Sequence, residues 1–452
     1  MNKTALSHFL LAATLCAADS ARIASVEQGL TRRINIEGQP QVHWTIAERQ
    51  KHHKVPAISV AVINDGKIEW AKAYGDGVTT HTRFQAASIS KPVAAVTALQ
   101  LVAQGKLSLD EKVNKKLKSV QIPENKWGKP VTLRQLLSHT AGLTVHGFPG
   151  YEKTVPLPTL VQIVKGEKPA NTAAVVVDVE PGSIYRYSGG GYQYVQILIE
   201  DVTGQPFAAA AKKYVLDPAK MADSGYDQPK ESAAAPAYDS KGQPVAGGWN
   251  IYPEQTAAGL WTTPSDLARF LLAMSSSKLL PEALTKEALT PIKGGYGLGF
   301  GMEGSGPAET FGHGGSNRGY RCQAMLYRNG RQGAVVMTNS DNGDAIVGEI
   351  TRAVANAYDW PSRKPTTHKM ITLPEGQLDA LAGAYQGPGL KLEISRNGNG
   401  LRVAVRDRLV DFVPESESRF IPLDDGAPSL VFEKDSNGIV VLKAGGGTFK
   451  KL

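Results

Sequence analysis

Alternating apolar and polar residues predict strands on both sides of a helical middle region. Residues 57–74 alternate around the turn Asn64-Asp65-Gly66, which predicts a β-hairpin. After residue 294 the same period of two returns, around a turn at residues 328–331. Strands that open and close a region can pair while the intervening helices pack beside them. The pattern therefore predicts an α+β fold, in which the late strands join the early hairpin in one antiparallel sheet next to a helical lobe.

The middle region contains several helix patterns. Residues 93–102 include only two polar side chains, so this helix is expected to be buried on nearly every side. Pro92 indicates that the helix begins no more than one turn before it, because proline is tolerated only in the first turn, where backbone N–H groups have no intrahelical partner. Further helices are expected at residues 41–54, at residues 131–143 and from residue 262 onward.

The pattern changes again near the end of the chain. Residues 359–377, with Pro361 and Pro365 among polar residues, are interpreted as a linker. Residues 378–452 consist of short alternating runs separated by glycine or asparagine turns, which predicts a small all-β domain. We therefore expect a main domain at residues 42–358, preceded by an extension at residues 19–41.

The first 18 residues have the pattern of a secretory signal. Lys3 precedes a short apolar run, and small residues follow it up to Ala18. The run is too short to cross a bilayer. We expect cleavage near Ala18 and a secreted, periplasmic protein. Cys322 would then be the last remaining cysteine, which excludes an internal disulfide and a C-x-x-C metal or redox site.

Composition limits the classes of partner. Hydrophobic residues make up 42% of the 452 residues and charged residues 20%, which is typical of a globular protein. The net charge of +8 comes from scattered basic residues without interleaved aromatic ones, so no nucleic acid is expected as a partner. No cofactor and no transmembrane segment are expected, and the oligomeric state stays open.

A serine and a lysine three residues apart carry the candidate chemistry. Ser88 and Lys91 form S-x-x-K at the mouth of the apolar helix, where they share one face. The lysine nitrogen can then take the proton of the serine hydroxyl, and the helix N-terminus favours negative charge nearby. The same spacing at Ser275 and Lys278 follows an amphipathic helix and is interpreted as a solvated helix end. Context therefore favours the first copy as a nucleophile and its base.

Two other side chains need an interpretation. Tyr187 and Ser188 come directly before a run of three glycines. At such a place the side chain of Tyr187 can project into a cleft. His139 falls near the end of a predicted helix, and a histidine there commonly interacts with the last carbonyl groups. We interpret His139 as structural.

Three stretches then occur in a fixed order. They are Ser88-Ile89-Ser90-Lys91, Tyr187-Ser188-Gly189 and His313-Gly314-Gly315. Together with residues 136–143 and 258–270, they resemble the serine β-lactamase and penicillin-binding-protein superfamily. The resemblance covers residues 42–358 and points to the branch of class C β-lactamases, related CubicO-like esterases and D-aminopeptidases. It implies a β-lactamase/transpeptidase-like fold for this catalytic domain.

The resemblance also implies roles for individual residues. Ser88 would be acylated, with Lys91 or Tyr187 as the base, and the backbone N–H groups of Ser88 and Ser316 would form the oxyanion hole. Residues 313–315 and Gly189 would contact the substrate. Neither candidate is deprotonated at neutral pH in its reference state, since the reference pKa values are about 10.4 for lysine and about 10 for tyrosine. Lowering the lysine pKa by about three units costs about 4 kcal/mol, which burial can supply.

Two positions depart from the β-lactamase pattern. His313 stands where those enzymes carry lysine, and Gly189 where they carry asparagine. Both changes weaken the case for β-lactam hydrolysis but leave acyl transfer intact. The preferred hypothesis is a secreted serine hydrolase that acts on an ester, peptide or amide, with a small molecule or peptide as acyl substrate. The alternatives are a true class C β-lactamase and a non-catalytic penicillin-binding or assembly protein.

Overall fold

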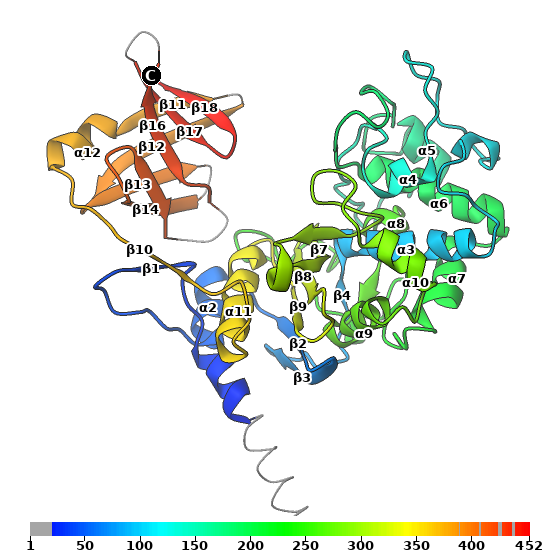
Figure 1. The fold of residues 1–452 in the computed structure, drawn as a ribbon, viewed down its shortest axis with the longest axis horizontal. Coiled ribbons are helices and arrows are strands. Elements are labelled where there is room, and N and C mark those ends of the chain that lie inside the picture. Colours follow the sequence, from blue (N-terminus) through cyan, green and yellow to red (C-terminus); the bar gives the residue numbers. More distant parts are fainter. Residues whose placement is uncertain (1–19, 388, 406–407, 424–426, 436–438) are drawn as a thin grey trace, which may run out of the picture. The chain divides into compact units, whose positions relative to one another are not determined.

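A computed structural model describes residues 20–387, 389–405, 408–423, 427–435 and 439–452 (Figure 1). The chain divides into two compact units, residues 47–343 and residues 20–46 with 344–452. The predicted signal at residues 1–18 lies outside the described residues. Across the described part of the chain, no helix combines the length and apolar character needed to cross a membrane.

The larger unit is built on a six-stranded antiparallel sheet with the strand order β3-β2-β9-β8-β7-β6. Its strands are β2 (Ile58–Asn64), β3 (Lys67–Tyr74), β6 (Gly301–Glu303), β7 (Thr310–Asn317), β8 (Tyr320–Tyr327) and β9 (Gly333–Thr338). The early strand β2 pairs with the late strand β9, with Ile58 opposite Thr338. This pairing confirms the predicted sheet, in which strands from both ends of the region meet. Outside this sheet, β4 (Phe84–Gln85) pairs with β5 (Trp261–Thr262).

The helical elements of this unit lie mainly between β4 and β6 in the chain. They are α2 (Ile46–His53), η1 (Ala87–Ile89), α3 (Ser90–Ala103), η2 (Val113–Lys115), α4 (Leu133–Leu137), α5 (Leu160–Lys165), α6 (Gly189–Thr203), α7 (Phe207–Ala211), η3 (Lys212–Leu216), η4 (Glu231–Ala233), α8 (Gln255–Ala258), α9 (Pro264–Ser275), α10 (Glu282–Ala288) and η5 (Gly306–Ala308). Helix α3 is the apolar helix of the sequence, and 11 of its 14 residues are buried, as predicted. It packs against α6 and α8, while α9 packs on the sheet (Figure 1).

The helix predicted at residues 131–143 is shorter than expected. A capping box between Thr132 and Gln135 starts α4, as the sequence pattern requires. The helix ends at Leu137 because the backbone turns left-handed at His139, with a φ of 57°. This early end matters for the site, because residues 139–146 become a loop beside Tyr187.

The second unit contains a closed eight-stranded barrel, which confirms the all-β prediction for the C-terminal region. Its strands are β11 (Gly383–Gly387), β12 (Leu390–Asn397), β13 (Gly400–Val405), β14 (Arg408–Pro414), β15 (Arg419–Pro422), β16 (Leu430–Lys434), β17 (Val440–Ala444) and β18 (Gly447–Lys451). Leu401, Phe420 and Leu442 lie in its own apolar core. The unit also contains α11 (Gly343–Ala357), α12 (Glu375–Leu381) and the parallel pair β1 (Ile34–Ile36) and β10 (Thr366–His368).

Candidate active site

Ser88 lies in the short helical turn η1, directly before α3. The preceding residue, Ala87, has a φ of 49°, an uncommon left-handed conformation for a residue with a Cβ atom. The buried Ser90 hydroxyl holds this turn, because it donates to Ala87 O at 2.6 Å and accepts from the backbone N–H of Leu260 at 3.0 Å. Ser88 itself is only half-buried, so its hydroxyl is the accessible one of the two.

Lys91 is the second residue of α3 and is only 2% exposed. Its Nζ atom is 2.9 Å from Ser88 Oγ and also donates to Ala257 O at 2.8 Å. Burial lowers the pKa of Lys91 to about 7, because the charged ammonium loses its hydration. At neutral pH a substantial fraction of this side chain is therefore a free amine, next to the serine hydroxyl.

Tyr187 reaches the same place from the loop before α6. The Lys91 Nζ atom lies 5.0 Å from the centre of the Tyr187 ring. Burial raises the pKa of the Tyr187 phenol, and a hydrogen-bonding interaction with the Ser88 side chain opposes this rise only in part. The phenol therefore keeps its proton at neutral pH. The structure thus brings together Ser88, Lys91 and Tyr187, which the sequence places in distant segments.

His139 holds the Tyr187 loop, which the sequence did not indicate. Its side chain was expected to interact with the last carbonyl groups of a helix, but its Nδ1 atom instead accepts the backbone N–H of Ser188 at 3.1 Å. The ring is 2% exposed and its centre lies 4.2 Å from that of Tyr187. Burial, with Lys91 and two other histidines nearby, holds the pKa of His139 well below its usual value. His139 is therefore a neutral acceptor.

Strand β7 lies against the serine turn. Its pairing with β6 covers only residues 310–312, so within the described chain residues 313–317 have no strand on that side and contact η1. A Cβ atom at Gly315 would lie 2.2 Å from Ala86 O and 2.4 Å from Cys322 Sγ. Only glycine permits this approach. Ser316 follows on the same segment, and its side chain is exposed.

The two departures from the β-lactamase pattern have structural counterparts. The Nδ1 atom of His313 is hydrogen-bonded to the Gly314 carbonyl. Burial, together with the nearby Lys91, lowers the pKa of His313 to about 4, so the ring is neutral. A Cβ atom at Gly189 would lie 3.0 Å from His146 O and 3.1 Å from the Phe148 ring. The space for a larger side chain at residue 189 is therefore taken by the loop at residues 146–148.

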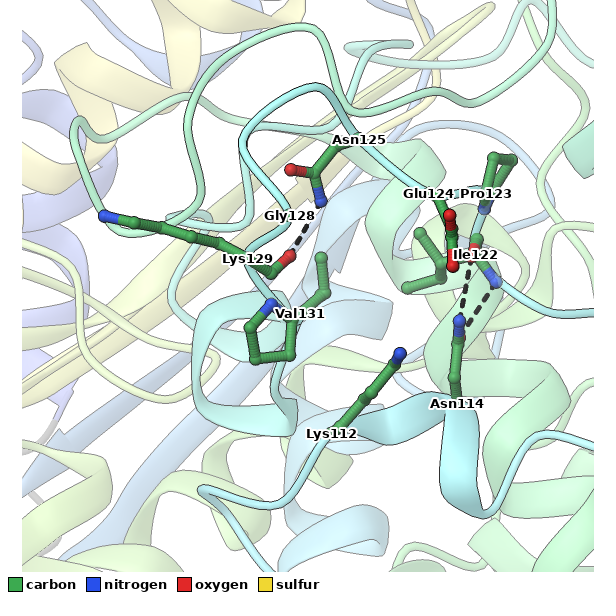
Figure 2. A pocket seen from close by; sticks show the side chains of 10 residues that line it. Lys112, Asn114, Ile122, Pro123, Glu124, Asn125, Gly128, Lys129 and Val131 are labelled. Atoms are coloured by element: carbon green, nitrogen blue, oxygen red, sulfur yellow. Dashed lines mark hydrogen bonds between the residues drawn. The ribbon is translucent and has the colours of Figure 1, made fainter.

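A separate cavity of about 290 Å³ lies away from these residues (Figure 2). It is lined by Lys112, Asn114, Ile122, Pro123, Glu124, Asn125, Gly128, Lys129, Pro130 and Val131. Asn114 Nδ2 donates to Ile122 O at 2.8 Å and Asn125 Nδ2 to Lys129 O at 2.7 Å, which fixes the loop around it (Figure 2). The lining includes no hydroxyl or thiol nucleophile.

Within the described ranges, no group of three or more His, Cys, Asp or Glu side chains is arranged to hold a metal ion.

An antiparallel sheet beside a helical lobe, with a serine hydrogen-bonded to a buried lysine between them, is the arrangement of a serine hydrolase. The family model named Beta-lactamase matches residues 43–359, well over half of the chain. The chain therefore belongs to the beta-lactamase family, and it is a hydrolase of the serine class.

Several known proteins are similar to parts of the chain. The teichoic acid D-alanine hydrolase of Staphylococcus aureus is 28% identical over 243 residues, which are 51% of this chain and 57% of that relative. The chain thus spans little more than half of that hydrolase. The octameric penicillin-binding protein homologue from Pyrococcus abyssi is 25% identical, with a TM-score of 0.63 over 90% of this chain and 98% of its own. A D-stereospecific amidohydrolase from Streptomyces, also 25% identical, has a TM-score of 0.53 over 68% and 95%.

Proposed function

We propose that this protein hydrolyses an ester, peptide or amide through an acyl-enzyme formed on Ser88. The observation that carries the proposal is the 2.9 Å contact between Ser88 Oγ and the Nζ atom of the buried Lys91. A lysine with a pKa of about 7 can accept a proton at neutral pH, whereas an exposed lysine cannot. Tyr187 keeps its proton and can pass it on.

The proposed reaction has two halves. Ser88 Oγ attacks the carbonyl carbon, and its proton passes to the neutral amine of Lys91. The Lys91 ammonium returns this proton, by way of the Tyr187 hydroxyl, to the leaving oxygen or nitrogen as the bond to the carbonyl carbon breaks. Water then attacks the carbonyl carbon of the acyl ester while Lys91 accepts a proton from it. The bond between Ser88 Oγ and the acyl group breaks, Lys91 returns the proton to Oγ, and the acyl group leaves as a carboxylic acid.

Backbone N–H groups of Ser88 and Ser316 are proposed to stabilise the oxyanion. Ser88 lies in the first turn of a helical segment, where N–H groups have no intrahelical partner. The contact between η1 and residues 313–317 of β7, which Gly315 permits, supports a place for Ser316 opposite Ser88. One such donor is typically worth about 3 to 4 kcal/mol in the transition state.

The substrate is proposed to lack the carboxylate that β-lactams present. A neutral His313 offers no cation, and Gly189 offers no side-chain amide. Two relatives are named for D-alanine hydrolysis and D-stereospecific amide hydrolysis. We therefore expect esters and amides of D-amino acids to be the first productive class in a substrate screen.

The decisive test compares two serine variants. Ser88→Ala should abolish turnover of a p-nitrophenyl ester and labelling by a fluorophosphonate probe. Ser275→Ala, which removes the serine of the second S-x-x-K, is the matched control and should retain both. Full activity in Ser88→Ala would disprove the proposal. A stable penicillin adduct on Ser88 without turnover would favour the binding or assembly alternative, and nitrocefin turnover as fast as ester turnover would favour a β-lactamase.

We also propose that the protein is secreted to the periplasm. The proposal is supported by Lys3, the apolar run and the small residues up to Ala18. Expression of the full chain in a bacterium with two membranes, followed by fractionation and mass analysis of the mature N-terminus, tests it. A cytoplasmic protein that keeps residues 1–18 would contradict it.

A further inference from the structure

His139 binds the residues on both sides of Tyr187. Its carbonyl oxygen accepts the backbone N–H of Arg186 at 2.8 Å, and its Nδ1 atom accepts the backbone N–H of Ser188 at 3.1 Å. The residue between these two hydrogen bonds is Tyr187. A single residue thus fixes the backbone of this loop immediately before and after the phenol that reaches Ser88.

The loop that contains His139 continues this contact. Gly189 N–H donates to His146 O and Gly190 N–H to Val145 O, both at 3.0 Å. Residues 139–146 therefore act as a template for residues 186–190. The backbone carbonyls in this template are available with any side chain, whereas the bond to Ser188 depends on the imidazole at residue 139.

Few side chains suit this position. The backbone of His139 has a φ of 57°, where asparagine, aspartate and histidine are several-fold enriched among residues with a Cβ atom. The bond to Ser188 requires a lone pair on Nδ1, so the ring must be neutral and carry its proton on Nε2. Burial favours the neutral ring, and the bond that Nδ1 accepts from Ser188 N–H selects the tautomer.

We propose that His139 is a positioning residue that holds Tyr187 against Ser88 during acyl transfer. It does not touch the reacting atoms, so its effect on catalysis passes through Tyr187. The inference rests on the proposed function, because the place of Tyr187 matters only if Ser88 is the nucleophile. A displacement of a catalytic group by about 1 Å can reduce the rate by about 100-fold.

Asparagine and glutamine at residue 139 form a matched pair for the test. The Oδ1 atom of asparagine can occupy the place of Nδ1, whereas the Oε1 atom of glutamine extends to the place of Nε2. His139→Asn should keep kcat for a p-nitrophenyl ester within about threefold of the parent, and His139→Gln should lower kcat at least tenfold with little change in KM. A purely structural role predicts equal kcat in both variants once folding is matched by thermal denaturation.

A double variant tests the route through Tyr187. Tyr187→Phe combined with His139→Gln should be no slower than Tyr187→Phe alone, because the phenol that His139 positions is already gone. Multiplied losses in the double variant would overturn the inference, as would a His139→Asn enzyme that folds but is as slow as His139→Gln. If Ser88→Ala remains active, the proposed function fails. If Ser88→Ala is inactive but His139→Gln is as active as the parent, the proposed function stands and the positioning role of His139 fails.

Discussion

Lys91 can act as a base because its charged form is costly to bury. Its two hydrogen-bond partners, Ser88 Oγ and Ala257 O, are both neutral, so no carboxylate restores the stability of the ammonium. The same burial has the opposite effect on a phenol, since its charged form is the deprotonated one. One environment therefore lowers the pKa of Lys91 and raises that of Tyr187, which separates their roles.

Activity is expected to rise with pH through about 7 and then to level off. Only the neutral amine of Lys91 accepts the Ser88 proton, so kcat/KM for an uncharged ester should follow the deprotonation of Lys91 in the free enzyme. Tyr187→Phe should lower the plateau but leave the rise near pH 7. If the rise disappears in Tyr187→Phe and stays in Lys91 variants that retain activity, the base is Tyr187 instead.

His313 is expected to determine whether the enzyme prefers a neutral or a negatively charged substrate. N-acetyl-D-alanyl thioesters of mercaptoacetic acid, mercaptoacetamide and methyl mercaptoacetate differ only in a terminal carboxylate, amide or ester. The parent should cleave the carboxylate member most slowly, because neutral His313 does not compensate a negative charge. His313→Lys should shift the ratio of kcat/KM for the carboxylate over the amide at least tenfold, as a charge-assisted hydrogen bond allows.

Thiol release measured with a chromogenic reagent gives these ratios. His43→Lys, at an exposed histidine in the other unit, adds the same charge and should leave the ratios as in the parent. A second series, with the variable group on the acyl side, tests the other end of the substrate. A parent enzyme that prefers the carboxylate in both series would show that His313 does not select against it.

At the scale of elements, the site exists because β7 can approach the turn η1. This approach requires glycine at residue 315, because any larger side chain there would collide with the Ala86 carbonyl and with Cys322. At Gly314, one residue earlier, a Cβ atom would come only within 3.3 Å of the end of the Gln323 side chain. A side chain can therefore be accommodated at residue 314 but not at residue 315.

Gly315→Ala should destabilise the protein by about 1–3 kcal/mol, the usual cost of forcing atoms into a packed interface. Gly314→Ala should be clearly milder, because the end of a glutamine side chain can move aside. Chemical denaturation measures both changes in the free energy of unfolding. Fluorophosphonate labelling of Ser88 should slow in Gly315→Ala as β7 moves away from η1. Equal destabilisation by both variants would contradict this account of the strand.

The elements and the site differed in how far the sequence could predict them. Apolar periodicity is local, so it predicted the hairpin, the buried helix α3 and the all-β character of the C-terminal region, and S-x-x-K predicted the contact of Ser88 with Lys91. The closure of the last eight strands into a barrel was not predicted. The role of His139 depends on a left-handed turn and on a bond to a residue 49 positions away, neither of which leaves a pattern. For the same reason the helix at residues 131–143 was predicted too long.

At the scale of the whole molecule, the proposed catalytic residues all lie in the unit of residues 47–343. The C-terminal barrel closes on itself, with β18 paired to β11, and has an apolar core of its own. A closed barrel leaves no unpaired sheet edge that would need another part of the chain. The two regions thus have separate sources of stability.

Removal of residues 370–452 should therefore leave the chemistry at Ser88 in place. The shortened chain keeps all of Ser88, Lys91, His139, Tyr187 and Ser316, and it keeps β10 for its pairing with β1. We expect kcat for a small p-nitrophenyl ester and fluorophosphonate labelling to stay within about threefold of the parent, since no deleted residue belongs to the serine site. Residues 370–452 expressed alone should unfold in one cooperative transition. A shortened chain that folds yet no longer reacts at Ser88 would mean that the barrel contributes to catalysis.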